Sequence, residues 1–342
     1  MNRCRDFIER MLLAFLLLPL AACGGPQSIL RPRGPAAGKL AQMGWVVLIL
    51  FSVVTLIVLA LLLWAALRRR GSLATHEPYN EGGGQSWVLI GGFAIPLVIL
   101  CGLFVYTLQG MTQFPLHSGH HVHAHADIQI IGHQWWWEVH YLSRETDRQF
   151  VTANEIHIPA GQPTDIELSS ADVIHAFWVP ALHGKIQLIP GQTNYIRIEA
   201  ERPGSFPGQC SVYCGAQHAH MRLLVVAQTP DEYEAWYEGQ IKEASEPRSA
   251  DAAHGREVFQ RAACALCHTI RGTGAEGKVA PDLTHLASRA MIGANSFVND
   301  TSDLEAWATH AQSLKPGAQM PDLTAYGGED LRDLVAYLRQ LK

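Results

Sequence analysis

The stretch GQCSVYCGAQHAHM, which spans residues 208–221, concentrates two cysteines, two histidines and a methionine in one short segment. Cys210 and Cys214 are four positions apart, His218 follows four positions later, and Met221 comes three after that. Structural zinc sites use four thiolate or imidazole ligands, whereas a set that adds a soft thioether favours copper. The alternative is a disulfide, which is common between exported cysteines, but closing a loop across three residues gives awkward geometry. The stretch therefore predicts a copper site.

The two cysteines indicate a pair of copper ions. A blue-copper centre needs one cysteine, so two thiolates favour two ions that are bridged by both sulfurs and share one added electron. The set still needs a histidine from elsewhere, and His175 in the segment DVIHAFW (172–178) lies 35 positions before Cys210. His220 is an alternative to His218, although the spacing favours His218.

The chain around this segment has the pattern of β-strands. Alternating or β-branched runs, separated by Pro and Gly, recur between residues 126 and 228. Period-two alternation with regular turn signals predicts an all-β sandwich or barrel. The clearest runs are ADIQII (126–131), EIHIP (155–159), TDIELS (164–169), YIRIEA (195–200) and RLLVVAQ (222–228).

A second motif, CALCH at residues 264–268, is the C-x-x-C-H signature of c-type haem attachment. Two thiols on one helical turn can add to both vinyl groups of one haem, and His268 then faces the iron. The alternative, a redox-active C-x-x-C pair, has no need of the histidine and is typical of a βαβ context that is lacking here. Met320, in the segment KPGAQMP (315–321), is the expected sixth ligand, with Met291 as the other candidate. Methionine–histidine ligation leaves no open position, which favours electron transfer over oxygen binding.

The segment from residue 251 onward is predicted to be helical. Ser302 and Glu305 form a capping box that would open a helix extending through Ala311. An apolar stripe predicts a C-terminal helix. The stripe consists of Leu331, Leu334, Val335 and Leu338.

The N-terminal third carries export and membrane signals. Three arginines, an apolar run at 11–18 and the segment LAAC (20–23) predict a lipoprotein signal at 1–22 with a lipid on Cys23; an uncleaved anchor is the alternative. Two charge-free apolar spans, 45–67 and 87–108, are each long enough to cross a bilayer. Three arginines at 68–70 place the loop between the spans in the cytoplasm, so that Cys23 and everything after residue 108 face outward.

Composition excludes some other functions. The chain has 342 residues and a formal net charge of −5, so it is neither a basic nucleic-acid binder nor an acidic disordered tail. Five histidines between residues 117 and 125 are interpreted as a polar linker, although such tracts also bind metal.

Together these motifs resemble those of subunit II of haem–copper cytochrome c oxidases, in the branch with a fused C-terminal cytochrome c domain. The resemblance implies a multi-domain fold: a two-helix transmembrane hairpin, an all-β cupredoxin domain of Greek-key type and an all-α class I cytochrome c domain. The expected boundaries are the signal at 1–22, the hairpin at 23–115, the cupredoxin domain at 116–240, a linker at 241–251 and the cytochrome c domain at 252–342.

The resemblance also implies the contents of both sites. The copper site would be the binuclear centre CuA, and the second site would hold covalently bound haem c. The implied CuA ligands are His175, Cys210, the carbonyl of Val212, Cys214, His218 and Met221, and the implied haem residues are Cys264, Cys267, His268 and Met320.

Two further positions are interpreted through the resemblance. Trp135, in the segment GHQWWW (132–137), matches the surface indole through which an electron enters CuA in the family, whereas Trp136 is expected to be ordinary packing. Val212 stands where the family often has a carboxylate that also binds magnesium beside subunit I, which disfavours a second metal there.

The implied function is electron transfer at the outer, periplasmic face of a bacterial inner membrane. Cytochrome c or another respiratory donor would reduce haem c, the electron would pass to CuA, and subunit I would use it to reduce oxygen and translocate protons. Subunit III is a further expected partner. Catalytic residues are not expected on this chain, because it shows no nucleophile or acid–base pair for bond-making chemistry.

Other functions remain as alternatives. A CuA subunit of a nitric oxide reductase relative would share these motifs, because the terminal chemistry lies in the partner. A lipid-anchored copper-binding or copper-delivery protein would hold one exchangeable copper and no haem, which the C-x-x-C-H motif argues against. A quinol oxidase subunit is disfavoured, because that branch lacks the copper cysteines.

Overall fold

The computed structural model describes residues 25, 27–67, 84–113, 126–262, 264–324 and 326–342. The chain divides into two compact units, one of which is Gly38–Pro115, while the other combines Met1–Ala37 with Leu116–Lys342. The predicted signal, Cys23, the three arginines at 68–70 and the histidine run at 117–125 lie outside the described residues.

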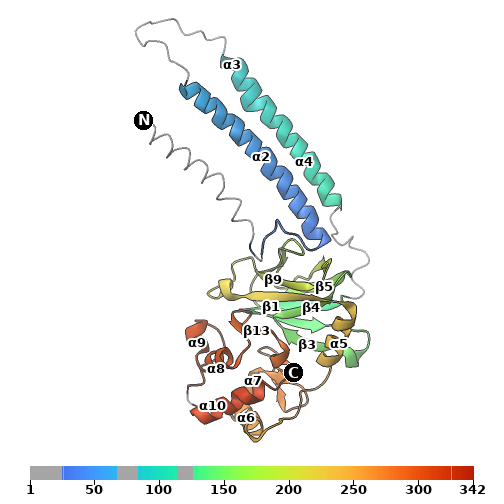
Figure 1. Cartoon of the computed structure of the whole chain (residues 1–342), viewed down its shortest axis with the longest axis vertical. Helices are drawn as coiled ribbons and strands as arrows, with labels where there is room; N and C mark the ends of the chain where they lie inside the picture. The colour runs from blue at the N-terminus through green and yellow to red at the C-terminus, as the bar shows by residue number, and fades with distance from the viewer. Residues whose placement is uncertain (1–24, 26, 68–83, 114–125, 263, 325) are drawn as a thin grey trace, which may run out of the picture. The chain divides into compact units, whose positions relative to one another are not determined.

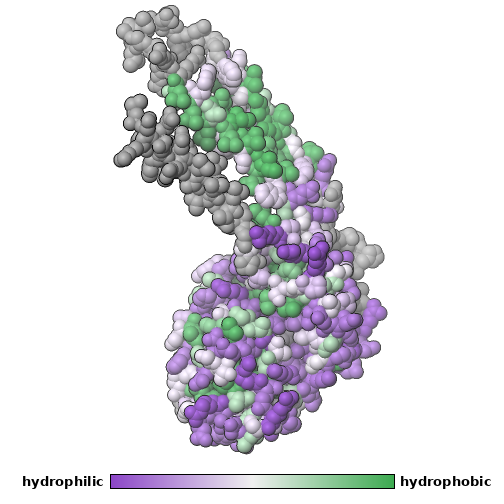
Figure 2. Space-filling view, viewed as in Figure 1, coloured by the Kyte–Doolittle hydropathy of each residue, from purple (hydrophilic) through white to green (hydrophobic). Residues whose placement is uncertain are grey.

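The smaller unit consists of long apolar helices. Helix α2 spans Pro35–Leu67, and a second helical stretch is built from α3 (Gly84–Trp87), the π-helical segment η1 (Val88–Ala94) and α4 (Ile95–Gln113). Pro96 has no backbone N–H, so it cannot donate the hydrogen bond that a regular α-helix needs at this position. The π-helical segment lies just before this proline. Both stretches are long and apolar enough to cross a membrane, and Figure 2 shows their surfaces as largely hydrophobic.

The first sheet of the larger unit has the strand order β3-β2-β1-β5-β8, with β1 and β5 parallel and the other neighbours antiparallel. Buried and partly exposed residues alternate along β1 and β2, as expected for strands with one face on a core. The strands are β1 (Ile128–His133), β2 (Trp136–Tyr141), β3 (Phe150–Ala153), β5 (Thr164–Ser170) and β8 (Asn194–Ile198).

The second sheet has the order β4-β10-β9-β6-β7, with β4 and β10 parallel. Side chains from both sheets meet in one hydrophobic core, which makes a two-layer sandwich (Figure 1). Its strands are β4 (Glu155–Pro159), β6 (His175–Trp178), β7 (Ile186–Leu188), β9 (Gly204–Cys210) and β10 (Arg222–Gln228). The all-β prediction for this region is therefore confirmed, and the runs at 155–159 and 222–228 coincide with β4 and β10.

Helix α5 (Pro230–Gln240) follows β10 and begins at a capping box that the sequence analysis did not identify. The Thr229 side chain accepts from the Glu232 backbone N–H, and the Glu232 carboxylate accepts from the Thr229 backbone N–H. The segment between α5 and the next helix contains no helix or strand.

The C-terminal part is a small helical domain with its own core (Figure 1). The apolar stripe predicted for the last helix is buried in α10, whose main packing partner is α6. Two short hairpins, β11–β12 (Thr269–Ile270 and Ala275–Glu276) and β13–β14 (Met291–Ile292 and Phe297–Val298), complete it. The helices are α6 (Ala250–Arg261), α7 (Cys264–Cys267), α8 (Thr301–Thr309), α9 (Ala311–Leu314) and α10 (Gly328–Leu338).

The predicted start of α8 was wrong by two residues. The cap is Asp300, whose carboxylate accepts from the Asp303 backbone N–H at 2.8 Å, and not Ser302. The helix also ends at Thr309, short of Ala311. Asp is as good an N-cap as Ser, so the sequence DTSD offered two competing starts.

Candidate functional site: two neighbouring redox centres

The copper loop, residues 210–221, is held at the end of the second sheet. Cys210 is the last residue of β9 and pairs with Phe177 of β6, so the strand that carries His175 lies beside the strand that delivers Cys210. The backbone N–H of Cys210 donates to the carbonyl of Met221 at 2.9 Å, which closes the loop at its base. The sheet thus brings together residues that are 35 positions apart in the sequence.

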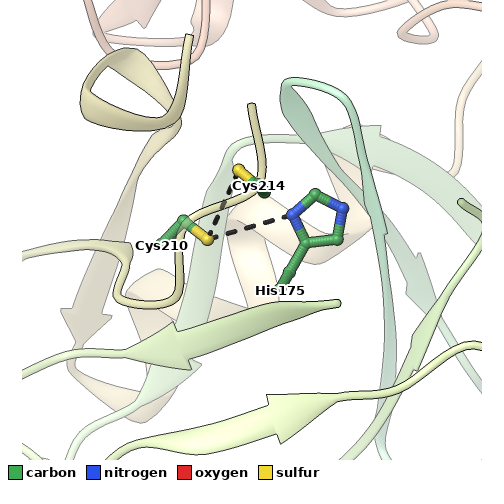
Figure 3. Close-up of side chains that lie close together, drawn as sticks. All are labelled: His175, Cys210 and Cys214. Carbon is green, nitrogen blue, oxygen red and sulfur yellow. Dashed lines mark hydrogen bonds between the residues drawn. The ribbon is translucent and has the colours of Figure 1, made fainter. Parts of the chain in front are cut away.

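Cys210, Cys214 and His175 point toward one another (Figure 3). The Sγ atoms of Cys210 and Cys214 are 3.8 Å apart, and the Nδ1 atom of His175 lies 3.9 Å from the Cys210 sulfur. His218 Nδ1 and Met221 Sδ lie 3.5 and 3.8 Å from the Cys214 sulfur. The Val212 carbonyl oxygen lies 3.2 Å from the Cys210 sulfur.

This donor set fits copper. The two cysteines are free and buried, so no disulfide competes for their sulfurs. Two thiols, two imidazoles, a thioether and a carbonyl surround one small volume, and soft sulfur donors of this kind select copper over the harder metals. His220 does not join them, since its Nδ1 bonds to Gln217 Oε1 at 2.7 Å.

The two cysteine sulfurs lie 3.8 Å apart and interact strongly. The hydrogen bond between them lowers the pKa of Cys210 to about 3 and, together with burial, raises the pKa of Cys214. Thiolate is the form that binds metal, so a lowered pKa at Cys210 favours metal binding, and a bound cation would displace the proton of the other thiol.

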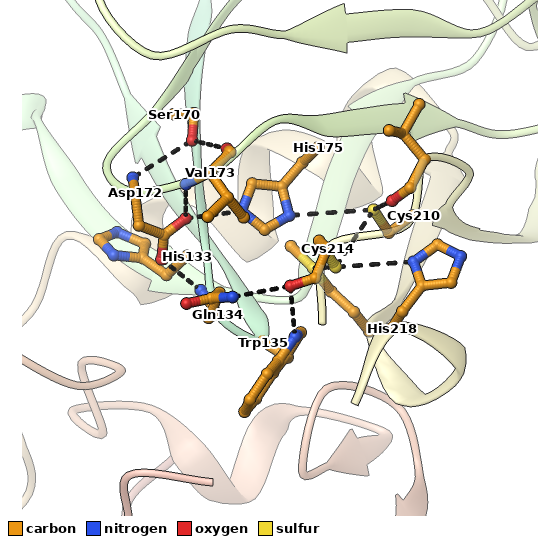
Figure 4. Close-up of polar contacts among 12 residues, drawn as sticks. His133, Gln134, Trp135, Ser170, Asp172, Val173, His175, Cys210, Cys214 and His218 are labelled. Carbon is orange, nitrogen blue, oxygen red and sulfur yellow. Dashed lines mark hydrogen bonds and ion pairs between the residues drawn. The ribbon is translucent and has the colours of Figure 1, made fainter. Parts of the chain in front are cut away.

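Asp172 was not identified from the sequence as part of this site. Its Oδ1 lies 2.8 Å from His175 Nε2, and its Oδ2 accepts from the Gln134 backbone N–H at 2.6 Å (Figure 4). Burial alone would lower the pKa of His175, but its hydrogen bonds to Cys210 and Asp172 raise it. The bond to Asp172 occupies Nε2 and directs Nδ1 toward the sulfurs, which is how carboxylates orient metal-binding histidines. The available signal was the position of Asp172, three residues before His175.

Gly132 was also missed. A Cβ atom at this position would lie 2.8 Å from Cδ2 of His175, closer than real Cβ contacts, so only glycine leaves room for the imidazole. The close approach joins strands from different sheets and has no signature in the sequence.

Trp135 lies directly against the copper loop. Its indole Nε1 donates to the Cys214 carbonyl at 3.0 Å, and Gln134 Nε2 donates to the same oxygen at 2.7 Å (Figure 4). Gly215 has a φ of +117°, and a Cβ there would lie 3.0 Å from the Trp135 ring, so glycine permits this contact.

Of the other two tryptophans, Trp137 rather than Trp136 packs in the core. Trp137 is fully buried in the core and packs edge-on against His175 and Phe177. Trp136, which was expected to be core packing, is only partly buried and stacks on His133. Strand β2 begins at Trp136, so alternation from that residue directs the next side chain inward.

A cavity of about 450 Å³ lies beside the C-x-x-C-H motif. Cys264, Cys267 and His268 line it, and Met291 and Met320 both reach its wall. Most of the remaining lining is apolar, from residues such as Phe259, Leu286, Leu304, Leu334 and Leu338. A large apolar cavity with two thiols and an imidazole on one wall fits a haem.

His268 is prepared to bind a metal through one nitrogen. Its Nδ1 lies 2.7 Å from the Pro281 carbonyl oxygen, so Nδ1 carries the proton and Nε2 is left as the ligand atom. Burial lowers the pKa of His268, which favours the neutral ring that metals require. Of the two methionines, geometry alone does not select one, and Met320 is preferred for its loop sequence.

The β-sandwich forms part of the wall of this cavity. Gln134, Trp135, Trp136 and Asn154 all contribute to its lining. Several hydrogen bonds join the sandwich to the helical domain within the same compact unit. They include Gln217 Nε2 to the Pro316 carbonyl, Arg222 N to the Ala294 carbonyl, Ala290 N to Glu155 Oε2 and Arg289 Nη2 to Thr152 Oγ1.

The fold and the two sites define a class of protein: a redox protein with apolar helices suited to a membrane, a cupredoxin domain and a cytochrome c domain. Residues 140–228 match the family model of the periplasmic domain of cytochrome c oxidase subunit II, and residues 252–342 match that of cytochrome c. Cytochrome c oxidase subunit 2 of Alkalihalophilus pseudofirmus is 35% identical over 338 residues, covering 96% of each chain. The chain therefore belongs to the family of cytochrome c oxidase subunit 2.

The chain is also similar to two further proteins. Cytochrome c oxidase subunit 2 of Bacillus subtilis is 26% identical over 352 residues, with 97% of each chain covered. Among solved structures, the periplasmic domain of subunit II of cytochrome oxidase from Bradyrhizobium japonicum is 32% identical, with a TM-score of 0.32; the match covers 34% of this chain and 94% of that one. The cupredoxin and cytochrome c domains of the family imply copper and haem for this chain.

Proposed function

We propose that this chain carries electrons from an external donor into a haem–copper oxidase, by way of haem c and then a binuclear CuA centre. Subunit I would take the electron from CuA, reduce oxygen and translocate protons. Cytochrome c or another respiratory protein would be the donor, and subunit III a further partner.

One observation carries the proposal: Trp135 belongs to both sites. Its ring lines the cavity beside the C-x-x-C-H motif, and its indole N–H donates to the carbonyl of Cys214. A single side chain therefore connects the haem cavity with a copper ligand, and Trp135 would be the residue through which the electron reaches CuA.

The residues of each site have separate tasks. His175, Cys210, the Val212 carbonyl, Cys214, His218 and Met221 would hold two copper ions, and Asp172 would fix the orientation of His175. Cys264 and Cys267 would attach the haem, with His268 and Met320 as axial ligands. When bound, each centre supplies one reversible electron transfer. At the copper site the protein excludes water, since Cys210, Cys214, His175 and Met221 are all buried.

The placement in the cell rests on the sequence. Removal of the signal at 1–22 and a lipid on Cys23 would anchor the start of the mature chain at the outer face of the membrane. Arginines in the loop between the two apolar helices would keep that loop in the cytoplasm. Both redox domains would then lie on the periplasmic face of the bacterial inner membrane.

The test is to purify the complex from membranes and measure its composition. We expect co-purifying oxidase subunits, about two copper ions in this subunit, a haem c that remains covalently bound after denaturation, and a spin-resonance signal from an electron shared by two copper ions. Oxygen consumption with a reduced cytochrome c should depend on this subunit.

Specific results would contradict the proposal. Zinc in place of copper, or a Cys210–Cys214 disulfide in the mature chain, would remove the basis for CuA. Consumption of nitric oxide without oxygen consumption would move the chain to a nitric oxide reductase relative. A single exchangeable copper without haem would indicate copper delivery.

A further inference from the structure

Lys315 is a buried cation at the boundary between the two sites. It lies directly after α9, at the start of the loop 315–321 that contains Met320, and only 3% of its surface is exposed. Its side chain also contributes to the lining of the haem cavity. Lysine is rarely buried unless its ammonium group has partners.

The partners of Lys315 come from both domains. Its Nζ donates to the carbonyl of His220 at 3.1 Å and to the carbonyl of Gly293 at 2.9 Å. His220 belongs to the copper loop and stands between the expected ligands His218 and Met221, whereas Gly293 belongs to the cytochrome c domain. The next residue, Pro316, accepts from Gln217, which ties the same two loops together a second time.

The Lys315 ammonium group also lies 5.9 Å from the centre of the Trp307 ring, but none of its partners carries a negative charge. No ion pair among the described residues includes it, and the charged group that acts on it is a second cation, Arg222. Burial is the main cause that lowers the pKa of Lys315 to about 8, with Arg222 adding to it. Two carbonyls and an aromatic ring offset part of the cost of burying this charge, but a counter-anion would offset more.

The cavity supplies a reason for the charge. Haem carries two carboxylates, so a haem in the cavity would bring the anion that Lys315 lacks. A cation beside a redox centre also favours its reduced form, because reduction adds a negative charge to that centre.

We propose that Lys315 is a positioning residue for electron transfer between the two centres, which ties the Met320 loop to the copper loop and places a positive charge beside the haem. This rests on the proposed function. The step that it serves moves one electron and no atoms: the cytochrome c site is oxidised by one electron as the copper site is reduced by one.

Substitutions in the purified complex separate the effect of the Lys315 charge from the effect of its hydrogen bonds between the two loops. In Lys315→Met, we expect the ratio of reduced to oxidised haem at a fixed potential to fall roughly tenfold, which for one electron equals a 59 mV lower reduction potential. Electron transfer from haem to CuA after a flash of photoreduction should slow by about tenfold, because the loops are no longer held in register. Lys315→Arg should restore the potential.

Ser296→Ala is the matched control. Ser296 Oγ donates to the same His220 carbonyl at 3.4 Å but carries no charge, so its loss should leave the haem potential unchanged. Lys315→Gln keeps a hydrogen-bond donor without the charge, and should lower the potential while slowing transfer less than Lys315→Met. If the complex with Lys315→Met does not assemble, Lys315→Gln still tests the proposal.

The outcomes are distinguishable from a failure of the proposed function. If the wild-type complex transfers electrons from haem to CuA, but Lys315→Met and Lys315→Gln keep its potential and rate, Lys315 has no positioning role. If Lys315→Arg shows the same potential change as Lys315→Met, the charge is not the cause. If the wild-type complex itself shows no such transfer, the proposed function fails first.

Discussion

The indole nitrogen of Trp135 lies 3.0 Å from the carbonyl oxygen of Cys214, a residue that also supplies one of the two sulfurs of the copper site. The ring of Trp135 is in reach of the loop that contains Met320, since a Cβ on Gly317 would be 3.8 Å from it. A covalent and hydrogen-bonded path therefore leads from the edge of the haem cavity to a copper ligand through one side chain.

Trp135→Phe should slow transfer from haem to CuA by about tenfold or more, because phenylalanine has no N–H to hold the ring against the Cys214 carbonyl. Flash photoreduction of the haem, followed optically at both centres, measures the rate. Metal content should be unchanged. Trp136→Phe is the control, since Trp136 also lines the cavity but has no bond to the copper loop; equal slowing in both variants would argue against the Trp135 path.

Cys210→Ser should abolish the CuA signal and stop oxygen reduction, because an alcohol at this position cannot supply the soft anionic donor that copper needs. Haem c should remain bound and reducible by the donor, since its residues lie in the cytochrome c domain. Elemental analysis, optical spectra and oxygen uptake measure these three effects. Oxygen uptake at the wild-type rate in this variant would show that the copper assignment is wrong.

Motifs within short stretches were predictable from the sequence. The two cysteines, His218 and Met221 lie in one loop, so their spacing alone indicated that they meet, and the C-x-x-C-H motif indicated the second site. The strands at 155–159 and 222–228 were likewise visible from their local pattern. His175 was predicted as a ligand only because the expected pair of copper ions needs one more histidine than the loop supplies.

Contacts between distant segments were not predictable in this way. Asp172 reaches both His175 and Gln134 because β1 of one sheet ends where β6 of the other sheet begins. Gly132 matters because a ring from another sheet approaches it. Lys315 reads as an ordinary surface lysine until the packing of the domains buries it. Each of these depends on register between sheets or domains, which local periodicity does not encode.

Asp172→Asn should weaken copper binding by about 10–100-fold, because the carboxylate orients His175 through Nε2. Titration of the metal-depleted complex with copper in competition with a chelator measures the affinity. Asp165→Asn is a control at another carboxylate, which pairs with Arg197 away from the copper loop. Unchanged affinity in Asp172→Asn would leave Asp172 without an orienting role.

Glu138 should make the stability of the β-sandwich depend on pH. Burial alone would raise its pKa, but hydrogen bonds from His133 and His140 outweigh burial and lower the pKa from its ordinary value of 4.5 to about 2. A depressed carboxylate stabilises the fold above its unfolded pKa, and this contribution is lost as the pH falls from about 4.5 to about 2.

The substitution that tests this is Glu138→Gln, which should reduce the free energy of unfolding at pH 7 by about 1–3 kcal/mol and flatten its decline below pH 4.5. Denaturant unfolding followed by tryptophan fluorescence at several pH values measures it. Glu201→Gln, at an exposed carboxylate, should leave the profile unchanged. A wild-type profile in Glu138→Gln would show that the pair of histidines does not stabilise the carboxylate.

Met320 and Met291 both reach the haem cavity, so their roles must be separated by substitution. Met320→Ala should remove the sulfur ligand, which abolishes the methionine-to-iron band in the optical spectrum and lowers the haem reduction potential, because methionine–histidine ligation raises it. Met291→Leu conserves volume and should cost less than about 1.5 kcal/mol of stability, with spectrum and potential unchanged. The opposite pattern, with the band lost in Met291→Leu and kept in Met320→Ala, would assign the sixth ligand to the β13–β14 hairpin and leave the loop 315–321 with the task of contacting the copper domain.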